Sequence, residues 1–449
     1  MASGGRAGEG RLSGDYFRLF GASVVSNLGD GIALVAYPWL ASAVTRSGLL
    51  IALVVVAGRL PWLIFSLPAG VLTDRFDRRK LMVGANIFRA GIGALMAVLV
   101  FVQDGLPTPD EIDLGEVAST NWSLYLSLLA ATFLLGMAEV LYDNTAQTVM
   151  PSIVESDLLE KANGRLWSTE QVMNTLIGPV LGAALLALTF TVPFVVDSMT
   201  FLVSALLIGS MRMRANLKES AGDAPPEAPP RWQDDLREGV RWLWAHDFLR
   251  PLAIILGLIN MLGTMSTSTL VLYAQEVLGT SPTEFALMST GGAAGGIVAG
   301  WVASAVSERI GAGPSLWLTI LVGGATMIVN GLVANWIVVW AMFALFMFVA
   351  VLWNVITVSL RQTIIPDHLL GRVNSVYRFF AWGMMPVGSM LAGVTIVVAE
   401  GFVDREDALR APWLLAGILH MAVIVYAGPK LTNRTIAAAR NSVSVDPAR

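Results

Sequence analysis

Residues 70–80 read GVLTDRFDRRK and lie between two long apolar segments, 47–73 and 80–103. An apolar run of about 20 residues can cross a hydrocarbon layer about 30 Å thick as a helix. The short connection carries four basic residues, and cytosolic loops of membrane proteins are enriched in Lys and Arg. Of the 449 residues in the whole chain, 55% are hydrophobic and only 14% are charged. The sequence therefore predicts an all-α membrane protein.

Ten more apolar segments bring the number of expected transmembrane helices to twelve. They cover 16–44, 122–147, 166–189, 191–212, 249–276, 283–306, 314–333, 335–360, 373–399 and 411–429. A polar, proline-rich stretch at 214–231 divides the twelve into six and six. The residues that follow it, 232–244, repeat apolar side chains with helical spacing, which predicts an amphipathic helix on the cytosolic membrane surface.

The fourth segment of each set ends in a similar sequence, QTVMP at 147–151 and QTIIP at 362–366. Duplicated halves of six helices are typical of secondary transporters, with the substrate site between the halves near the middle of the membrane. We therefore expect two pseudo-symmetric bundles, which we call the first and second halves. The expected divisions are an N-terminal tail at 1–15, the first half at 16–213, a cytosolic linker with its helix at 214–248, the second half at 249–429 and a C-terminal tail at 430–449.

The distribution of basic residues orients this arrangement. If the N-terminus is cytosolic, only three of the 29 Lys and Arg residues fall in external segments: Arg46, Arg405 and Arg410. Two more lie within helices, and the rest lie on the cytosolic side. This asymmetry predicts a multi-pass protein of the cell membrane with both termini in the cytosol.

The composition also argues against several classes of site. The chain has no cysteine, and its three histidines lack the spacing of metal ligands. We therefore expect no metal, no cofactor and no disulfide. No nucleophile constellation suggests an enzyme, and we expect a monomer that binds no nucleic acid.

Residues 70–80 resemble the loop signature G-x-L-x-D-R-x-G-R-[RK] of the major facilitator superfamily, with Asp77 in place of the usual glycine. The resemblance implies the twelve-helix fold of that family. It also implies that the loop is a conformational latch, which here would comprise Gly70, Asp74, Arg75 and Arg78 together with Asp143. By this resemblance Arg78 would pair with Asp143 on the fourth helix.

The fifth expected helix contains Gly178, Pro179 and Gly182, which resemble the core of a signature found in the drug–proton antiporters of this family. Proline kinks a helix, and glycines allow close approach at the seam between domains. Stretches such as NLGD at 27–30 and DSMTF at 197–201 resemble the branch that exports macrolides, drugs and enterobactin. The resemblance covers nearly the whole chain.

Ionisable residues within membrane helices are costly and are therefore candidates for function. Asp30 lies deep in the first helix and is our first candidate for the proton carrier, and Glu139 on the fourth helix is the second. Alternatively, Asp30 is structural and pairs with Arg59 or Arg89. Candidates for the substrate cavity are Arg59, Arg89, Asn260, Asn354 and Tyr377.

The prediction from sequence is a secondary active transporter that exports a small, largely apolar compound, such as a drug, antibiotic or siderophore, by proton antiport. Its partners would be that compound, protons and the lipid bilayer. Two alternatives stay open: an uptake carrier or facilitator of the same fold, and a membrane sensor or scaffold without transport.

Overall fold

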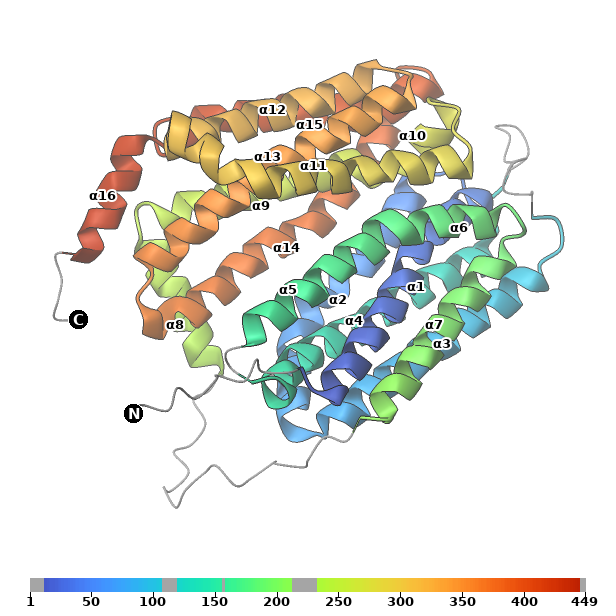
Figure 1. The fold of residues 1–449 in the computed structure, drawn as a ribbon. Coiled ribbons are helices and arrows are strands. Elements are labelled where there is room, and N and C mark those ends of the chain that lie inside the picture. Colours follow the sequence, from blue (N-terminus) through green and yellow to red (C-terminus); the bar gives the residue numbers. More distant parts are fainter. Residues whose placement is uncertain (1–11, 107–118, 156–157, 212–231, 445–449) are drawn as a thin grey trace, which may run out of the picture. The chain divides into compact units, whose positions relative to one another are not determined.

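The computed structural model describes residues 12–106, 119–155, 158–211 and 232–444, and all regular elements in these ranges are helices (Figure 1). Eleven segments among them are long and apolar enough to cross a membrane. The predicted all-α class is confirmed. The remaining expected span, 166–189, falls within three consecutive short helices, so the structure is compatible with twelve spans.

The chain forms two compact units. The described residues of the first unit fall within 1–36, 64–103 and 134–221, and those of the second within 37–63, 104–133 and 222–449. Three helices therefore contribute to both units. The division of the chain into first and second halves stays a prediction.

The first unit is built from helices of the first half. They are α1 (Gly14–Val44), α2 (Gly48–Arg75), α3 (Arg78–Phe101), α4 (Trp122–Ile153), α5 (Leu159–Val172), the π-helix η2 (Met173–Ile177), α6 (Gly178–Leu186) and α7 (Thr191–Gly209). Within this unit α3 and α7 pack side by side (Figure 1). A buried apolar cluster that includes Tyr16, Met82, Val149 and Ile208 joins α1, α3, α4 and α7.

The expected fifth helix is interrupted by η2, which ends just before the Gly178–Pro179 pair. Proline has no N–H, and its ring clashes with the carbonyl four residues earlier in a regular α-helix. The wider π turn, in which the Gly178 N–H donates to the Met173 carbonyl, accommodates this proline. The helix is therefore irregular, as a π turn, at the position where the sequence predicts a kink.

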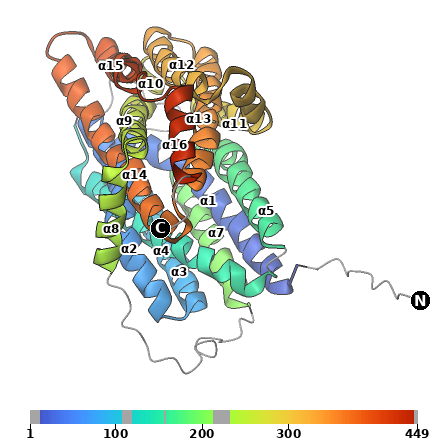
Figure 2. The ribbon, with the colours of Figure 1, turned by 90° about the vertical axis from the view of Figure 1, so that its left-hand side faces the viewer.

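The second unit contains the helices of the second half and the linker helix. They are α8 (Trp232–Ala245), α9 (Leu249–Thr267), α10 (Leu270–Glu276), α11 (Pro282–Ile310), α12 (Ala312–Leu332), α13 (Trp336–Ile364), α14 (Asp367–Ala399), α15 (Arg405–Ala427) and α16 (Asn433–Ser444). The closest pairs are α11 with α13, α9 with α14 and α12 with α15. Figure 2 shows α16 beside α13, against which it packs.

One expected helix, 249–276, is divided into α9 and α10 at Ser268 and Thr269. The hydroxyls of Thr267 and Ser268 donate to the backbone carbonyls of Gly263 and Thr264, four residues earlier. Such bonds compete with the helical ladder and bend a helix. The expected break at 333–335 is confirmed, because the Asn335 side chain caps the start of α13.

The predicted amphipathic helix is present as α8. Its Gly239 lies against the backbone of Arg372 on α14, and its Leu243 is fully buried. The Glu238 carboxylate pairs with the Arg372 guanidinium. Part of the apolar face of α8 therefore packs on protein.

Candidate functional site

Arg89 on α3 lies in an acidic cluster of the first unit. Its side chain is 4% exposed, and its guanidinium donates to the carboxylate of Asp30 on α1. Glu139 and Asp143 on α4 and Asp197 on α7 also interact electrostatically with Arg89. One guanidinium thus pairs with one carboxylate and interacts at longer range with three more, and the four carboxylates come from three helices. We call these five residues the Arg89 cluster.

The members of the Arg89 cluster differ in their access to solvent. The Asp30 side chain is 28% exposed, whereas Asp197 is 2% exposed. One carboxylate oxygen of Asp197 and the Nε of Arg89 are buried, with no hydrogen-bond partner among the described residues. Buried polar atoms without partners are costly, and they favour the binding of a proton or a water molecule. Asp30 is better placed than Asp197 to exchange a proton with water.

Two glycines beside Asp30 allow other helices to approach α1. A Cβ atom at Gly29 would lie 2.7 Å from the Asp197 carboxylate, so only glycine leaves room for that side chain. A Cβ atom at Gly31 would lie 2.8 Å from the Cα of Gly178. At Gly182, a Cβ atom would lie 2.8 Å from the carbonyl oxygen of Ile32. The backbone of the kinked fifth helix therefore contacts α1 directly beside Asp30.

The loop at 70–80 joins α2 to α3 near the end of α4. Asp77 caps α3, because its carboxylate accepts the backbone N–H of Lys80 at 2.9 Å. This cap explains why aspartate suits a position that is usually glycine. Arg78 reaches α4, where it donates to the carbonyl of Thr148 at 3.0 Å, while Asp143 belongs to the Arg89 cluster.

The latch itself stays a prediction. Arg75 is exposed, and no heavy atom of the described residues lies within 4 Å of a Cβ atom built on Gly70. The side chain of Asp74, the other expected member, lies outside the described ones.

The second unit contains a cavity of about 90 Å³ between α9, α12, α13 and α15. Two of the expected substrate-cavity residues, Asn260 and Asn354, line it together with Trp353 and His420. Trp353 and His420 are 2% and 3% exposed, and each has a buried ring nitrogen without a partner among the described residues. The cavity therefore combines apolar walls with the two side-chain amides of Asn260 and Asn354.

The remaining candidates lie elsewhere. Arg89 belongs to its own cluster, whereas Arg59 is exposed and its guanidinium carbon lies 5.9 Å from the centre of a Trp382 ring. Tyr377 is 1% exposed, and the guanidinium of Arg361 lies over its ring. Within the described ranges, no group of three or more His, Asp or Glu side chains is arranged to hold a metal ion.

Residues 19–390 match the sequence profile of the Major Facilitator Superfamily, and this span is most of the chain. The chain belongs to the Major Facilitator Superfamily. It is therefore a multi-span membrane transporter of that family.

Two relatives match this chain over almost the whole length of both proteins. The multidrug efflux pump Tap of Mycolicibacterium fortuitum is 26% identical over 418 residues, which cover 89% of this chain and 93% of Tap. Macrolide efflux protein A of Streptococcus pyogenes is 20% identical over 414 residues, which cover 91% and 94%.

Solved structures of other transporters share the superfamily fold. A bacterial homologue of the iron transporter ferroportin, in an inward-facing state, has a TM-score of 0.65 at 16% identity and covers 92% of this chain and 98% of its own. A bacterial homologue of the lysosomal transporter Spinster, also inward-facing, has a TM-score of 0.65 at 14% identity and covers 97% and 98%. At this identity the likeness shows the fold alone.

Sequence reasoning missed three features of these sites. It assigned Asp143 to the latch, although the charges around Arg89 include it. It considered His420 only as a possible metal ligand, although His420 is buried beside the cavity of the second unit. The third is the pairing of Glu276, at the end of α10, with Arg46 and Arg405. A single carboxylate at the far end of the expected helix 249–276 is the signal that could have found it.

Proposed function

We propose that this transporter exports a small, largely apolar compound and that protons moving in the opposite direction drive it. The names of its relatives, a multidrug efflux pump and a macrolide efflux protein, support export. The observation that carries the proton part is the Arg89 cluster, in which one buried guanidinium pairs with Asp30 and interacts electrostatically with three further carboxylates. Among the described residues of this cluster carboxylates outnumber guanidinium groups, and repulsion between partly buried carboxylates is relieved when one of them binds a proton.

Asp30 is the member that we assign as the proton carrier. It is the carboxylate that pairs directly with Arg89, and its side chain retains access to solvent. A proton on Asp30 would weaken that pair and release Arg89 toward the other carboxylates. Because Gly31 packs on Gly178, a shift of α1 at Asp30 would act directly on the kinked fifth helix. Protonation would in this way favour one of two conformations.

The cavity of the second unit is our proposal for part of the substrate site. Its described lining has apolar side chains and the amides of Asn260 and Asn354, but no charged group. An uncharged segment of an apolar compound fits these properties, because the lining offers apolar contacts and two neutral amides. The volume suits one substituent of such a compound.

The proton assignment is tested by export into inverted vesicles under a pH gradient. Asp30→Asn imitates the protonated side chain, so we expect it to abolish uphill export while substrate binding and exchange of substrate for substrate remain. Glu139→Gln is the matched change, and we expect it to keep uphill export. If the two variants behave the other way round, the proton site lies on α4. If neither loses uphill export, a facilitator without proton coupling is the better description.

A further inference from the structure

A second cavity, of about 490 Å³, lies in the first unit between α1 and α5, which run side by side in Figure 2. By the expected orientation this is the cytosolic end of both helices. The cavity is lined from α1 by three aromatic residues and from α5 by two basic and two hydroxyl side chains. They are Tyr16, Phe17, Phe20, Lys161, Arg165, Ser168 and Thr169. We call this cavity the α1–α5 pocket, and the proposed export mechanism does not use it.

Tyr16 holds the two helices together at the base of the α1–α5 pocket. Its side chain is 1% exposed, and its hydroxyl donates to the carbonyl of Ala162 on α5 at 3.4 Å. The ring of Phe17 lies edge-on to that of Tyr16, with ring centres 5.4 Å apart. Phe17 is 56% exposed. Exposed aromatic rings at the ends of membrane helices are typical of the membrane–water interface.

The α5 side of the pocket is basic. Lys161 and Arg165 are exposed and lie four residues apart, so they are neighbours on one face of α5. Neither forms an ion pair with a carboxylate among the described side chains, and no acidic side chain of the described ranges lines the pocket. Ser168 and Thr169 add two hydroxyls one turn further along. Two cations and two hydroxyls suit a ligand with several anionic oxygen atoms.

The internal repeat of the sequence shows how the matching surface is used in the second unit. Residues 158–163 read LLEKAN, and residues 369–374 at the start of α14 read LLGRVN. This alignment matches Lys161 with Arg372 and Thr169 with Phe380. Both residues of α14 contact the linker helix α8. Arg372 pairs with the Glu238 carboxylate, and the ring of Phe380 stacks on Trp244 with ring centres 5.7 Å apart.

The α1–α5 pocket is therefore the counterpart of a surface that is occupied by a carboxylate and an aromatic side chain in the second unit. A ligand in the place of α8 must bring a negative charge for Lys161 and Arg165 and an apolar part for Phe17. An anionic phospholipid has both, because its phosphate suits the cations and its acyl chains suit the exposed ring. Basic pockets between membrane helices on the cytosolic side bind such headgroups.

Two other occupants match the pocket less well. Residues 1–11, which precede α1, contain two arginines, one glutamate and no aromatic residue, so a basic pocket does not attract them. A soluble anion such as glycerol 3-phosphate neutralises the cations but does not cover the ring of Phe17. We propose that the α1–α5 pocket binds an anionic phospholipid of the cytosolic leaflet, with the phosphate on Lys161 and Arg165 and an acyl chain along Phe17.

The test is native mass spectrometry of the purified full-length transporter with added lipid. We expect phosphatidylglycerol to bind more tightly than phosphatidylcholine. Lys161→Gln and Arg165→Gln should each weaken the binding of phosphatidylglycerol by about fivefold, the effect of one basic residue on an anionic lipid. Gly164→Leu should weaken it without removing a charge. Gly164 lines the pocket, and no heavy atom of the described residues lies within 4 Å of a Cβ atom built on it, so a larger side chain there occupies open space.

Arg309→Gln is the matched control. Arg309 is an exposed arginine in the last turn of α11, on the expected cytosolic side, but it does not line the pocket. Its removal should leave the binding of phosphatidylglycerol unchanged, and an equal loss in this variant would contradict a localised site. The proposal is also overturned if the three pocket variants bind phosphatidylglycerol as the parent protein does.

Two further outcomes would show a different occupant and would equally overturn the proposal. Glycerol 3-phosphate that binds as tightly as the lipid would show a site for a soluble anion. Binding of phosphatidylglycerol only after deletion of residues 2–10 would show that the N-terminal segment occupies the pocket. Lipid binding is measured without export or a proton gradient, so this inference fails or succeeds separately from the proposed proton antiport.

Discussion

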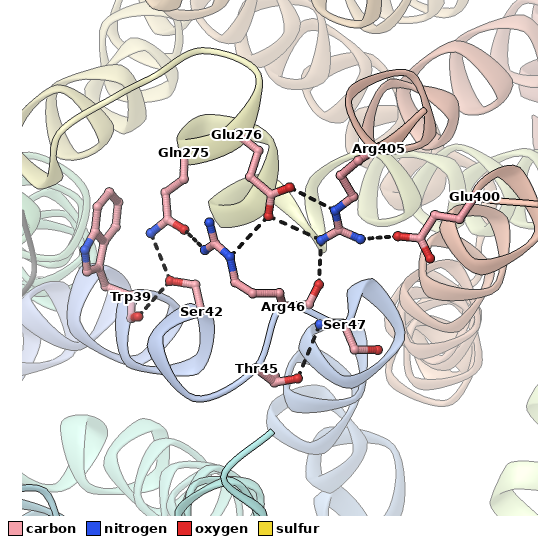
Figure 3. Close-up of polar contacts among 9 residues, drawn as sticks. All are labelled: Trp39, Ser42, Thr45, Arg46, Ser47, Gln275, Glu276, Glu400 and Arg405. Carbon is pink, nitrogen blue, oxygen red and sulfur yellow. Dashed lines mark hydrogen bonds and ion pairs between the residues drawn. The ribbon is translucent and has the colours of Figure 1, made fainter. Parts of the chain in front are cut away.

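The Arg89 cluster of the first unit and the ion pairs around Glu276 in the second unit (Figure 3) use the same kinds of side chain, but they differ in charge balance. Around Arg89, one carboxylate pairs with the cation and three more interact with it at longer range, and polar atoms of Arg89 and Asp197 remain without partners among the described residues. Around Glu276, two arginines and two glutamates form a chain of ion pairs: Arg46 pairs with Glu276, Glu276 with Arg405, and Arg405 with Glu400. Each centre contains an ion pair with one buried side chain, Arg89 in the first and Glu276 in the second. Only the first centre has more negative than positive side chains.

The difference teaches what each arrangement can do. A surplus of carboxylates can gain or lose protons without dismantling the group, which suits a coupling site. A balanced set has no such surplus, and its free energy changes mainly when its members move apart, which suits a mechanical contact. We therefore propose proton exchange for the first unit and a structural contact for the balanced pairs of the second.

The largest effect should follow from removing the cation of the unbalanced cluster. Arg89→Gln leaves four carboxylates without their guanidinium, and breaking a buried ion pair from one side costs about 3–5 kcal/mol. We expect the melting temperature in detergent to fall sharply and export into inverted vesicles to be lost. Arg59→Gln is the matched control, because Arg59 is exposed and should change stability by less than about 0.5 kcal/mol. Equal melting temperatures for the two variants would refute the central role of Arg89.

A smaller effect should follow from separating α1 from the kinked helix that packs beside Asp30. A Cβ atom at Gly178 would lie 2.6 Å from the Cα of Gly31, a backbone atom that cannot rotate away. Overpacking of this kind costs about 1–3 kcal/mol, so Gly178→Ala should lower both stability and the rate of export. Gly164→Ala on α5 is the control, since no described heavy atom lies within 4 Å of its Cβ position. If the two alanine variants melt alike, the contact between α1 and the fifth helix is not as tight as described.

Much of this organisation could be predicted from the sequence, because apolar runs and proline report on single helices. The helical class and the break before α13 followed from length, hydropathy and Asn335. Pairing of Asp30 with Arg89 was one of two open alternatives. The contact of Glu276 with Arg46 could not be predicted, because the two residues lie far apart in sequence. The spacing of apolar residues along one helix does not determine which other helix that helix contacts.

The same limit applies to local competition between side chains and backbone. The division of α9 from α10 depends on the hydroxyls of Thr267 and Ser268 bonding to preceding carbonyls, although the hydropathy of 249–276 is continuous. Serine and threonine are also common inside unbroken membrane helices, so their presence alone does not predict a break.

The smallest effect concerns pH and a single residue of the second unit, outside the membrane spans. Nδ1 of His246 accepts the backbone N–H groups of Phe248 and Leu249, both at 3.2 Å, so it must be unprotonated to cap the start of α9. Burial lowers the pKa of His246, and the nearby Asp247 only partly opposes this. Because the folded state binds the proton less tightly, this contribution to stability is complete above the ordinary pKa of about 6.5 and is lost as the pH falls toward the lowered value. The His246→Asn variant keeps a hydrogen-bond acceptor that does not titrate. The melting temperature of this variant should therefore fall less than that of the parent protein between pH 7.5 and 5.5.

Export should respond to pH in the same way in both proteins, because the Arg89 cluster is unchanged. If the variant instead shifts the pH dependence of export, proton coupling extends to the second unit and the contrast between the two centres is wrong.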